Sequence, residues 1–294
     1  MNEISLKAYG KLNLSLDVVG KKPNGYHLVR MIMQTVDLYD TITIKKQAEQ
    51  GITLSTNRED LPTNEDNLIF KATKMLMDEF HITDGVSIHL EKRIPVAAGM
   101  AGGSTDCAAT LNGINQLFQL GLSKEELMER GVKMGADIPY CVLGGTALSE
   151  GIGEVLTPLK DIPDCRLLLI KPNIDVSTKW VYTTLKWDEI KEHPDTDGMI
   201  ADLEQGNLSG ISSKLKNVLE EVTIPEYPVI DDIKKTMRSL GADNALMSGS
   251  GPTVFGIFTD SNAGEIAYKK CKELYSDYQV EWTSFISRTQ IEQQ

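Results

Sequence analysis

Polar and apolar residues alternate near the start of the chain. Every second position from residue 12 to residue 18 is apolar, and the positions between them are polar. A period of two is typical of a β-strand with one buried face, so we expect Lys11 and Asn13 to lie together on the opposite face. A turn signal, Pro23-Asn24-Gly25, follows this run.

The residues that follow the turn, up to about residue 90, are predicted to form further strands and one helix. Strand-like runs are predicted over residues 31–38 and 41–45, and another over residues 86–90. Apolar residues recur at helical spacing over residues 67–80, between the second and third of these runs. The first third of the chain is therefore predicted to be mainly antiparallel β-structure with one helix.

Two more helices are predicted before residue 140. A helical stripe begins at Cys107, directly after a glycine-rich segment, so those glycines are expected at a helix N-terminus. Ser123 and Glu126 match a capping box at the start of the next helix, which Gly135 is expected to close. Asp137 follows just beyond that predicted end.

The second half of the chain alternates helices and strands without an internal repeat or a low-complexity tract. Helices are expected over residues 178–185, 208–221 and 229–240, and strands over residues 166–170, 245–247, 254–258 and 279–285. The class is α+β. A chain of 294 residues is suited to two domains, and a join near residues 158–164 predicts domains at 1–160 and 161–294.

Composition restricts the classes of partner. The chain has 30 basic and 42 acidic residues, for a net charge of -12, which argues against nucleic-acid and anionic-membrane binding. Its four cysteines contain no CxxC pair, so neither a disulfide framework nor a zinc site is indicated. No signal peptide and no apolar run of about 18 residues is found. We expect a cytoplasmic protein with a small-molecule partner and no obligate protein partner.

The glycine-rich segment from Pro95 to Asp106 has the composition of a phosphate-binding loop. Unpaired amides in the first turn of a helix point toward a ligand, and the helix dipole adds roughly 0.3 to 1 kcal/mol for an anion. Glycine also permits positive φ and close approach of the backbone. The alternative is a tight turn whose glycines serve packing alone. The segment fits neither the Walker A pattern nor Gly-x-Gly-x-x-Gly.

Three segments in order resemble motifs of the GHMP kinases, the superfamily of galactokinase, homoserine kinase, mevalonate kinase and phosphomevalonate kinase. The loop resembles Pro-x-x-x-Gly-Leu-Gly-Ser/Gly-Ser-Ser, with Met100 in place of leucine and Ala101 in place of glycine. Residues 8–14, which contain Lys11, resemble the first motif, and residues 247–255 resemble the third. Because all three occur in order across the chain, it is identified as a member of the superfamily.

Within the superfamily, Gly25-Tyr26-His27 and residues 135–139 most resemble the branch that phosphorylates a cytidine-diphosphate-linked polyol in isoprenoid precursor synthesis. The resemblance implies two domains, an N-terminal ribosomal-protein-S5-domain-2-like domain and a C-terminal ferredoxin-like domain, with a cleft between them. It implies ATP and Mg²⁺ as cofactors and a cytidine-diphosphate compound as substrate. Another alcohol, such as homoserine or a mevalonate intermediate, and an inactive nucleotide-binding regulator remain the alternatives.

The resemblance also implies roles for single residues. Asp137 corresponds to the catalytic carboxylate, and Lys11 to its neighbour beside the γ-phosphoryl group; the alternatives are a helix cap and a solvated strand lysine. The residues that correspond to nucleotide contacts are Asn67, Lys92, Pro95, Ala98, Gly99, Met100, Ala101, Gly102, Gly103, Ser104, Thr105 and Asp106. Ser104 is the implied Mg²⁺ contact.

The substrate side follows from the same resemblance. The implied substrate-binding residues are Asn13, Tyr26, His27, Tyr182, Ser248, Gly249, Ser250 and Gly251. An aromatic ring after a turn can stack on a nucleobase, and His27 can read the edge of cytosine. Tyr182 corresponds to a second stacking aromatic. The alternatives are a loop pair that covers the core for Tyr26 and His27, and helix packing for Tyr182.

Overall fold

The computed structural model describes residues 2–293. The chain forms two compact units, and each is assembled from separate stretches of sequence. Unit 1 contains the chain up to Gly10, Leu38–Val96 and Ala101–Leu143, and unit 2 contains Lys11–Asp37, Ala97–Met100 and the chain from Gly144 onward. The predicted division into 1–160 and 161–294 is contiguous instead, and it stays a prediction about the domains.

Two long strands, β1 (Glu3–Lys21) and β2 (His27–Gln47), run from one unit into the other. The predicted turn joins them, and Gly25 has a φ of 89° there. The prediction of two separate runs in β2 is wrong. The strand continues because its partners change along its length, with β5 beside residues 31–34 and β4 beside residues 41–47.

The prediction of one buried face for residues 11–18 is also wrong. The polar positions Lys11, Asn13, Ser15 and Asp17 are 5%, 0%, 0% and 7% exposed. Each has a hydrogen-bonding partner inside unit 2: for example, Ser15 Oγ accepts from the Ile32 amide. The alternation therefore separates two buried faces, one apolar and one hydrogen-bonded.

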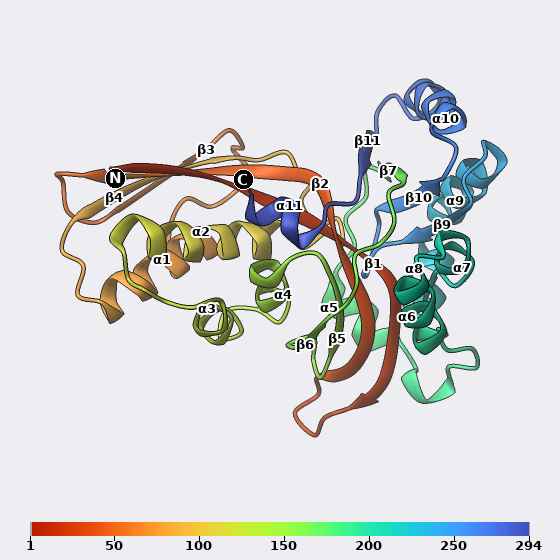
Figure 1. Cartoon of the computed structure of the whole chain (residues 1–294), viewed down its shortest axis with the longest axis horizontal. Helices are drawn as coiled ribbons and strands as arrows, with labels where there is room; N and C mark the ends of the chain where they lie inside the picture. The colour runs from red at the N-terminus through yellow and green to blue at the C-terminus, as the bar shows by residue number, and fades with distance from the viewer. Residues whose placement is uncertain (1, 294) are drawn as a thin grey trace. The chain divides into compact units, whose positions relative to one another are not determined.

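Unit 1 is a sheet with helices on one face (Figure 1). Antiparallel β2–β4 and parallel β3–β4 pairings build the sheet. Besides the first part of β1 and the second part of β2, unit 1 contains β3 (Ile52–Thr56), β4 (Gly85–Glu91), α1 (Leu68–Glu79), α2 (Gly102–Phe118), α3 (Lys124–Gly131) and α4 (Ile138–Leu143). Apolar side chains of α1 and α2 pack with those of β2 and β4 in one core.

The predicted helices of unit 1 are present, with one correction. Asn67 is the N-cap of α1, and the capping box of Ser123 and Glu126 is formed at α3. However, α3 ends at Gly131 rather than near residue 135, and α4 follows as an additional helix. A Cβ at Gly131 would lie 2.6 Å from Ile138 Cγ2, so this glycine lets α4 pack closely on α3.

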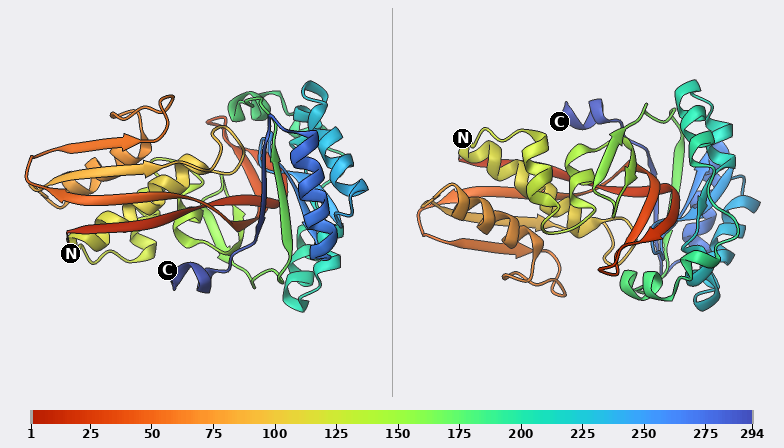
Figure 2. Two further views of the ribbon diagram at one scale, coloured as in Figure 1. Left: turned by 90° about the horizontal axis from the view of Figure 1, so that it is seen from above. Right: turned by 90° about the horizontal axis from the view of Figure 1, so that it is seen from below.

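Unit 2 contains a second sheet whose order is β11-β7-β10-β9, with antiparallel neighbours. Helices α9 and α10 cover one of its faces (Figure 2). Its elements are β7 (Arg166–Lys171), α9 (Val229–Ser239), β9 (Asn244–Met247), β10 (Val254–Phe258), α10 (Ser261–Leu274) and β11 (Gln279–Ser284). Helices connect the first strand to the second and the third to the fourth, which is the ferredoxin-like arrangement.

The remaining elements of unit 2 accompany the second half of β1, from Lys11 onward, and the first half of β2, up to Asp37. They are β5 (Thr146–Glu150), β6 (Val155–Pro158), α5 (Thr178–Thr184), η1 (Trp187–Glu189), α6 (Thr196–Gln205), α7 (Leu208–Ser213), β8 (Lys216–Asn217), α8 (Glu220–Glu226) and α11 (Arg288–Glu292). The predicted helix over 208–221 is wrong. It is divided because β8 pairs in parallel with Ser15 and Leu16 of β1.

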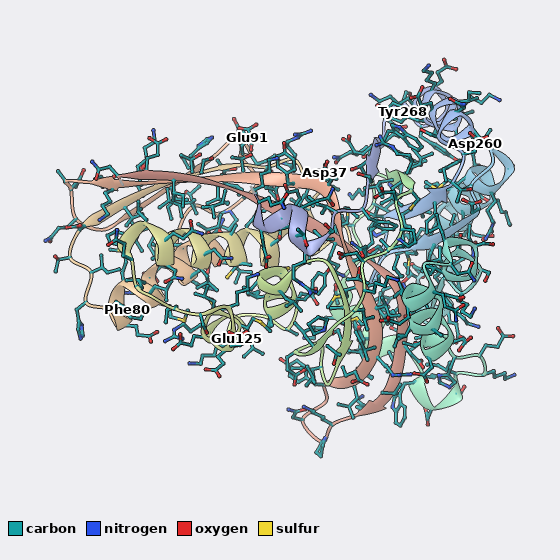
Figure 3. The ribbon with its side chains drawn as sticks, viewed as in Figure 1. Asp37, Phe80, Glu91, Glu125, Asp260 and Tyr268 are labelled. Atoms are coloured by element: carbon teal, nitrogen blue, oxygen red, sulfur yellow. The ribbon has the colours of Figure 1, made fainter. Side chains whose placement is uncertain are left out.

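Helix α10, which the sequence pattern did not predict, is fixed at both its start and its middle (Figure 3). Asp260 Oδ1 accepts from the amides of Asn262 and Ala263, and the Tyr268 ring stacks on Trp282 of β11. A Cβ at Gly264 would lie 2.1 Å from Trp282, so only glycine allows this approach. Within residues 2–293, no helix is both long and apolar enough to cross a membrane.

Candidate active site

The glycine-rich loop has left-handed backbone at alternate positions. Ala97, Gly99 and Ala101 have φ values of 51°, 69° and 56°. Ala101 directly precedes α2 and provides no side-chain cap, so the first amides of the helix are not covered by a capping side chain. The prediction that the glycines lie at a helix N-terminus is confirmed. Such an end can bind phosphate oxygens.

The loop meets the third motif in unit 2. Ser248 Oγ donates to the Gly99 carbonyl oxygen at 2.9 Å. A Cβ at Gly99 would lie 2.1 Å from the Ser248 carbonyl oxygen, so the close approach requires glycine. A Cβ at Gly249 would lie 3.5 Å from Asn13 Oδ1. Two loops that are about 150 residues apart in sequence are thus joined by a hydrogen bond from the Ser248 side chain to the backbone of Gly99, and their backbones approach closely.

Lys11 belongs to the same group of residues in unit 2. Its Nζ donates to Asn13 Oδ1 at 2.7 Å and to the Gly99 carbonyl oxygen at 3.3 Å, and its amide donates to the Met100 carbonyl oxygen. The side chain is buried rather than solvated, so the alternative of a surface lysine is wrong. Both acceptors are neutral, and no carboxylate pairs with Lys11 in the part of the chain described here. Its positive charge is available to an anion.

Asp137 lies in unit 1 between α3 and α4. Its carbonyl oxygen accepts from the Cys141 amide at 3.1 Å. Among residues 2–293 its carboxylate has no hydrogen bond or ion pair, so it does not cap a helix through its side chain. The carboxylate is therefore free to orient a ligand. The predicted proximity of Asp137 and Lys11, which belong to different units, stays a prediction.

Three predicted nucleotide contacts in unit 1 differ in whether their polar side-chain atoms already have hydrogen-bond partners. Asn67 uses both ends of its amide: Oδ1 accepts from the Ile69 amide at 2.9 Å, and Nδ2 donates to the Pro62 carbonyl oxygen at 2.8 Å. Thr105 Oγ1 donates to the Tyr9 carbonyl oxygen. No hydrogen bond of the Ser104 hydroxyl is found over the described range. Ser104 is thus the hydroxyl of the loop that can accept a ligand.

Two further predicted contacts form a buried ionic group. Lys92 Nζ donates to Asp106 Oδ2 and to Asp40 Oδ2, both at 2.6 Å. Burial, aided by the negative charge of Asp40, raises the pKa of Asp106 to about 8 despite the neighbouring ammonium. The sequence prediction missed Asp40. Asp40 occupies an inward-facing position of β2 between Leu38 and Ile42. A carboxylate at a position where the period-two pattern expects an apolar residue was the signal that could have identified it.

The predicted base-binding aromatics His27 and Tyr182 meet in unit 2. Their ring centroids are 5.5 Å apart at an interplanar angle of 34°. His27 is 8% exposed, and its buried Nε2 has no hydrogen-bond partner within the described residues. Burial, and then the charge of Lys21, lowers the pKa of His27 from its ordinary 6.5, so the ring is neutral near pH 7. Tyr26 beside it is 59% exposed.

The third motif is held by a residue that the sequence prediction did not identify. Asn217 Nδ2 donates to the carbonyl oxygens of Met247 and Gly249, at 2.9 and 2.7 Å. The hydroxyls of Thr178 and Ser250 are also hydrogen-bonded, at 2.9 Å. A signal for Asn217 was its place inside a predicted helix, where asparagine is unfavourable.

Known proteins are similar to this chain over most of its length. Residues 67–145 match the GHMP kinases N terminal domain, and residues 199–277 match the GHMP kinases C terminal domain. A 4-diphosphocytidyl-2-C-methyl-D-erythritol kinase of Lachnoclostridium phytofermentans is 59% identical over 92% of this chain and 94% of its own length. One of Clostridium perfringens is 50% identical over 94% of this chain and 97% of its own.

Solved structures are similar over the same extent. The crystal structure of a 4-(cytidine 5'-diphospho)-2C-methyl-D-erythritol kinase has a TM-score of 0.82 at 26% identity, covering 96% of this chain and 99% of that one. A homoserine kinase from Cytophaga hutchinsonii has a TM-score of 0.79 at 19% identity, covering 98% of this chain and 95% of that one. The second similarity is one of fold alone.

Proposed function

Because this chain belongs to the GHMP kinases, and among them to the 4-diphosphocytidyl-2-C-methyl-D-erythritol kinase family, we propose that it transfers the γ-phosphoryl group of ATP to the 2-hydroxyl of that cytidine compound. The similarity to curated enzymes of this name over almost the whole chain carries the proposal. The reaction consumes ATP in the cytoplasm and serves isoprenoid precursor synthesis.

The start of α2 supports the phosphate-binding part of the proposal. Its first amides follow the left-handed Ala101 without a side-chain cap, and the positive end of the helix dipole lies there. Phosphate oxygens accept hydrogen bonds from amides in this position without a charged side chain. We assign Gly102, Gly103 and Ser104 to the β- and γ-phosphates of ATP.

Lys11 and Asp137 are assigned to the transfer itself. The oxygen of the substrate hydroxyl bonds to the γ-phosphorus while the bond from phosphorus to the ADP oxygen breaks. Asp137 orients the hydroxyl and accepts its proton late in the transfer, when the alcohol has become acidic. The Lys11 ammonium, held by neutral oxygens, balances charge on the phosphoryl oxygens.

A magnesium ion fits the residues that are present. Mg²⁺ in kinases is held mainly by substrate phosphates, with one or two protein groups and water. No cluster of three metal-binding side chains is found within residues 2–293, and the unbonded Ser104 hydroxyl at the start of α2 can supply one oxygen. The ion would neutralise charge on the β- and γ-phosphates. Asp106 accepts from Lys92 through Oδ2, while its buried Oδ1 has no hydrogen-bond partner within the described residues.

The unpartnered Nε2 of His27 supports recognition of cytosine. A buried ring nitrogen without a hydrogen bond is costly, and a ligand edge with a complementary group would satisfy it. Since His27 is neutral near pH 7, its ring offers one donor and one acceptor to the base. We assign the neighbouring rings of Tyr26 and Tyr182 to the two faces of the cytosine.

The proposal is tested by ADP release with Mg²⁺ and ATP across three alcohols. Turnover is expected with 4-diphosphocytidyl-2-C-methyl-D-erythritol and not with homoserine or mevalonate. Tyr26→Ala is expected to raise the KM for the cytidine compound about tenfold, because stacking on a base contributes ~1 to 3 kcal/mol. The KM for ATP should not change.

Tyr278→Ala is the matched control. Tyr278 stacks on Tyr275 in unit 2 at a centroid distance of 5.4 Å and belongs to none of the proposed binding groups. Both KM values should stay at the wild-type level in this variant. Preferred turnover of homoserine or mevalonate would refute the assigned substrate. If no ADP is released with any of the three alcohols, the assignment as a kinase of these alcohols is refuted.

A further inference from the structure

A buried carboxylate in unit 1 contacts the segment that leads into the phosphate loop. Asp40 on β2 is 0% exposed, and its two oxygens receive donors from three consecutive residues. Oδ1 accepts from the amides of Arg93 and Ile94, at 2.5 and 2.8 Å, and Oδ2 accepts from Lys92 Nζ at 2.6 Å. One side chain thereby fixes residues 92–94, immediately before the loop begins at Pro95.

Lys92 extends this contact to the start of α2. The same ammonium donates to Asp106 on that helix. A Cβ at Gly102 would lie 2.9 Å from Lys92 Nζ and 3.2 Å from Ile94 Cγ2, so the first residue of the helix lies against both. The segment before the loop and the helix after it are therefore held together through Lys92.

Asn57 fixes the same segment from the other side. Its Oδ1 accepts from the Lys92 amide at 2.8 Å, and its Nδ2 donates to the Lys92 carbonyl oxygen at 3.2 Å. The backbone of residues 92–94 thus has side-chain partners at each amide. Burial of a carboxylate costs free energy unless the group is well hydrogen-bonded. All the hydrogen-bond donors found for Asp40 within the described residues come from residues 92–94.

We propose that Asp40 is a positioning residue for ATP. It holds residues 92–94, and through Lys92 the first turn of α2, in the geometry in which the loop amides bind phosphate. Asp40 itself touches no substrate. Hydrogen bonds weaken steeply with poor alignment, so a shift of the loop amides relative to the phosphates would reduce the affinity for ATP. The inference rests on the proposed function, since it requires that the loop binds ATP.

The test is calorimetric titration of the full chain with Mg²⁺ and ATP, without an alcohol substrate. Asp40→Ala removes the acceptor of both amides and is expected to raise the Kd for ATP about tenfold, the loss of one charge-assisted hydrogen bond. Asp40→Asn keeps an oxygen for the amides and should give an intermediate Kd. Amide hydrogen exchange of residues 93 and 94 should be faster in Asp40→Ala.

A further variant separates positioning from general destabilisation. Asp202→Asn breaks a comparable ion pair in unit 2, where Asp202 accepts from Lys214 Nζ at 2.6 Å. Its Kd for ATP should equal that of the wild type.

The outcomes are distinct. A folded Asp40→Ala protein with wild-type Kd and amide exchange would overturn the inference alone. Where Asp40→Ala does not unfold cooperatively, a wild-type Kd in Asp40→Asn would overturn it. A wild-type chain that binds no ATP would overturn the proposed function as well. In steady state, a KM for ATP that rises while the KM for the alcohol stays constant supports positioning, whereas a fall in kcat alone would refute it.

Discussion

Lys11 and Asp137 differ in how their side chains are held. The Lys11 ammonium is buried and donates to two neutral oxygens, which fix its direction and leave its charge unpaired. The Asp137 carboxylate has no internal partner in residues 2–293. An alcohol is far less acidic than a carboxylic acid, so a carboxylate is a weak base for it. Orientation of the hydroxyl is therefore its main proposed contribution, with proton acceptance late in the transfer.

Replacement of Asp137 by alanine should affect turnover and not ATP binding. We expect kcat to fall by about 10² to 10⁴, the range found for general acid–base groups, with the Kd for ATP unchanged. Steady-state kinetics and calorimetry measure the two quantities separately. Asp277→Ala, an exposed aspartate of unit 2, is the control and should keep wild-type kcat. Near-normal turnover in Asp137→Ala would remove this residue from the mechanism.

The turn before α2 keeps a strained alanine. Ala101 has left-handed φ and ψ of 56° and 29°, which costs an L-residue roughly 1 to 2 kcal/mol and glycine almost nothing. The strain persists because the backbone before Ala101 is fixed at two points: the Gly99 carbonyl oxygen accepts from Ser248 in unit 2, and the Ile94 amide donates to Asp40 in unit 1. Backbone strain of this kind is often found at ligand-binding loops.

Ala101→Gly should therefore stabilise the protein. Relief of the strain, less the greater entropy of glycine in the unfolded chain, leaves a gain of about 0.5 to 1 kcal/mol in the free energy of unfolding. Ala108→Gly in the same helix removes a buried methyl group from ordinary helical backbone and should lose at least about 1 kcal/mol instead. Urea denaturation measures both variants. A loss of stability in Ala101→Gly would show that the alanine conformation is not strained.

Unit 2 depends on residues from the beginning of the chain. The Ile286 amide donates to the Thr35 carbonyl oxygen at 3.1 Å, and Thr283 Oγ1 donates to the Asp37 carbonyl oxygen at 2.9 Å. Strand β8 pairs with Ser15 and Leu16 of β1. These contacts join the last third of the chain to residues 11–37, so the ferredoxin-like sheet is only part of a larger unit.

A fragment of residues 161–294 should consequently not fold cooperatively by itself. It retains the sheet β11-β7-β10-β9 but loses the pairing of β8 with β1 and the bonds to Thr35 and Asp37. Thermal unfolding followed by circular dichroism should show a broad transition. Co-expression with residues 1–160 should restore a sharp one. A sharp transition of the isolated fragment would support the contiguous division at residue 160.

Features with local causes were determined by the sequence. The capping box of α3 needs only Ser123 and Glu126, three residues apart, and the turn at Gly25 needs only its own φ. The helix start after the glycine-rich loop, and the strands of the second sheet, likewise follow from neighbours within a few positions. The three motifs were enough to identify the family from the sequence because each is a short contiguous pattern.

Tertiary structure decided which polar residues are buried and what they contact. Asp40 meets the Ile94 amide across 54 positions, and Ser248 meets Gly99 across 149. The pairing of β8 with β1 likewise divided a segment that reads as one helix. A period of two or 3.6 reports only which residues share a face, so it cannot identify a partner on a distant segment. Buried polar groups require such partners, and the fold alone brings them together.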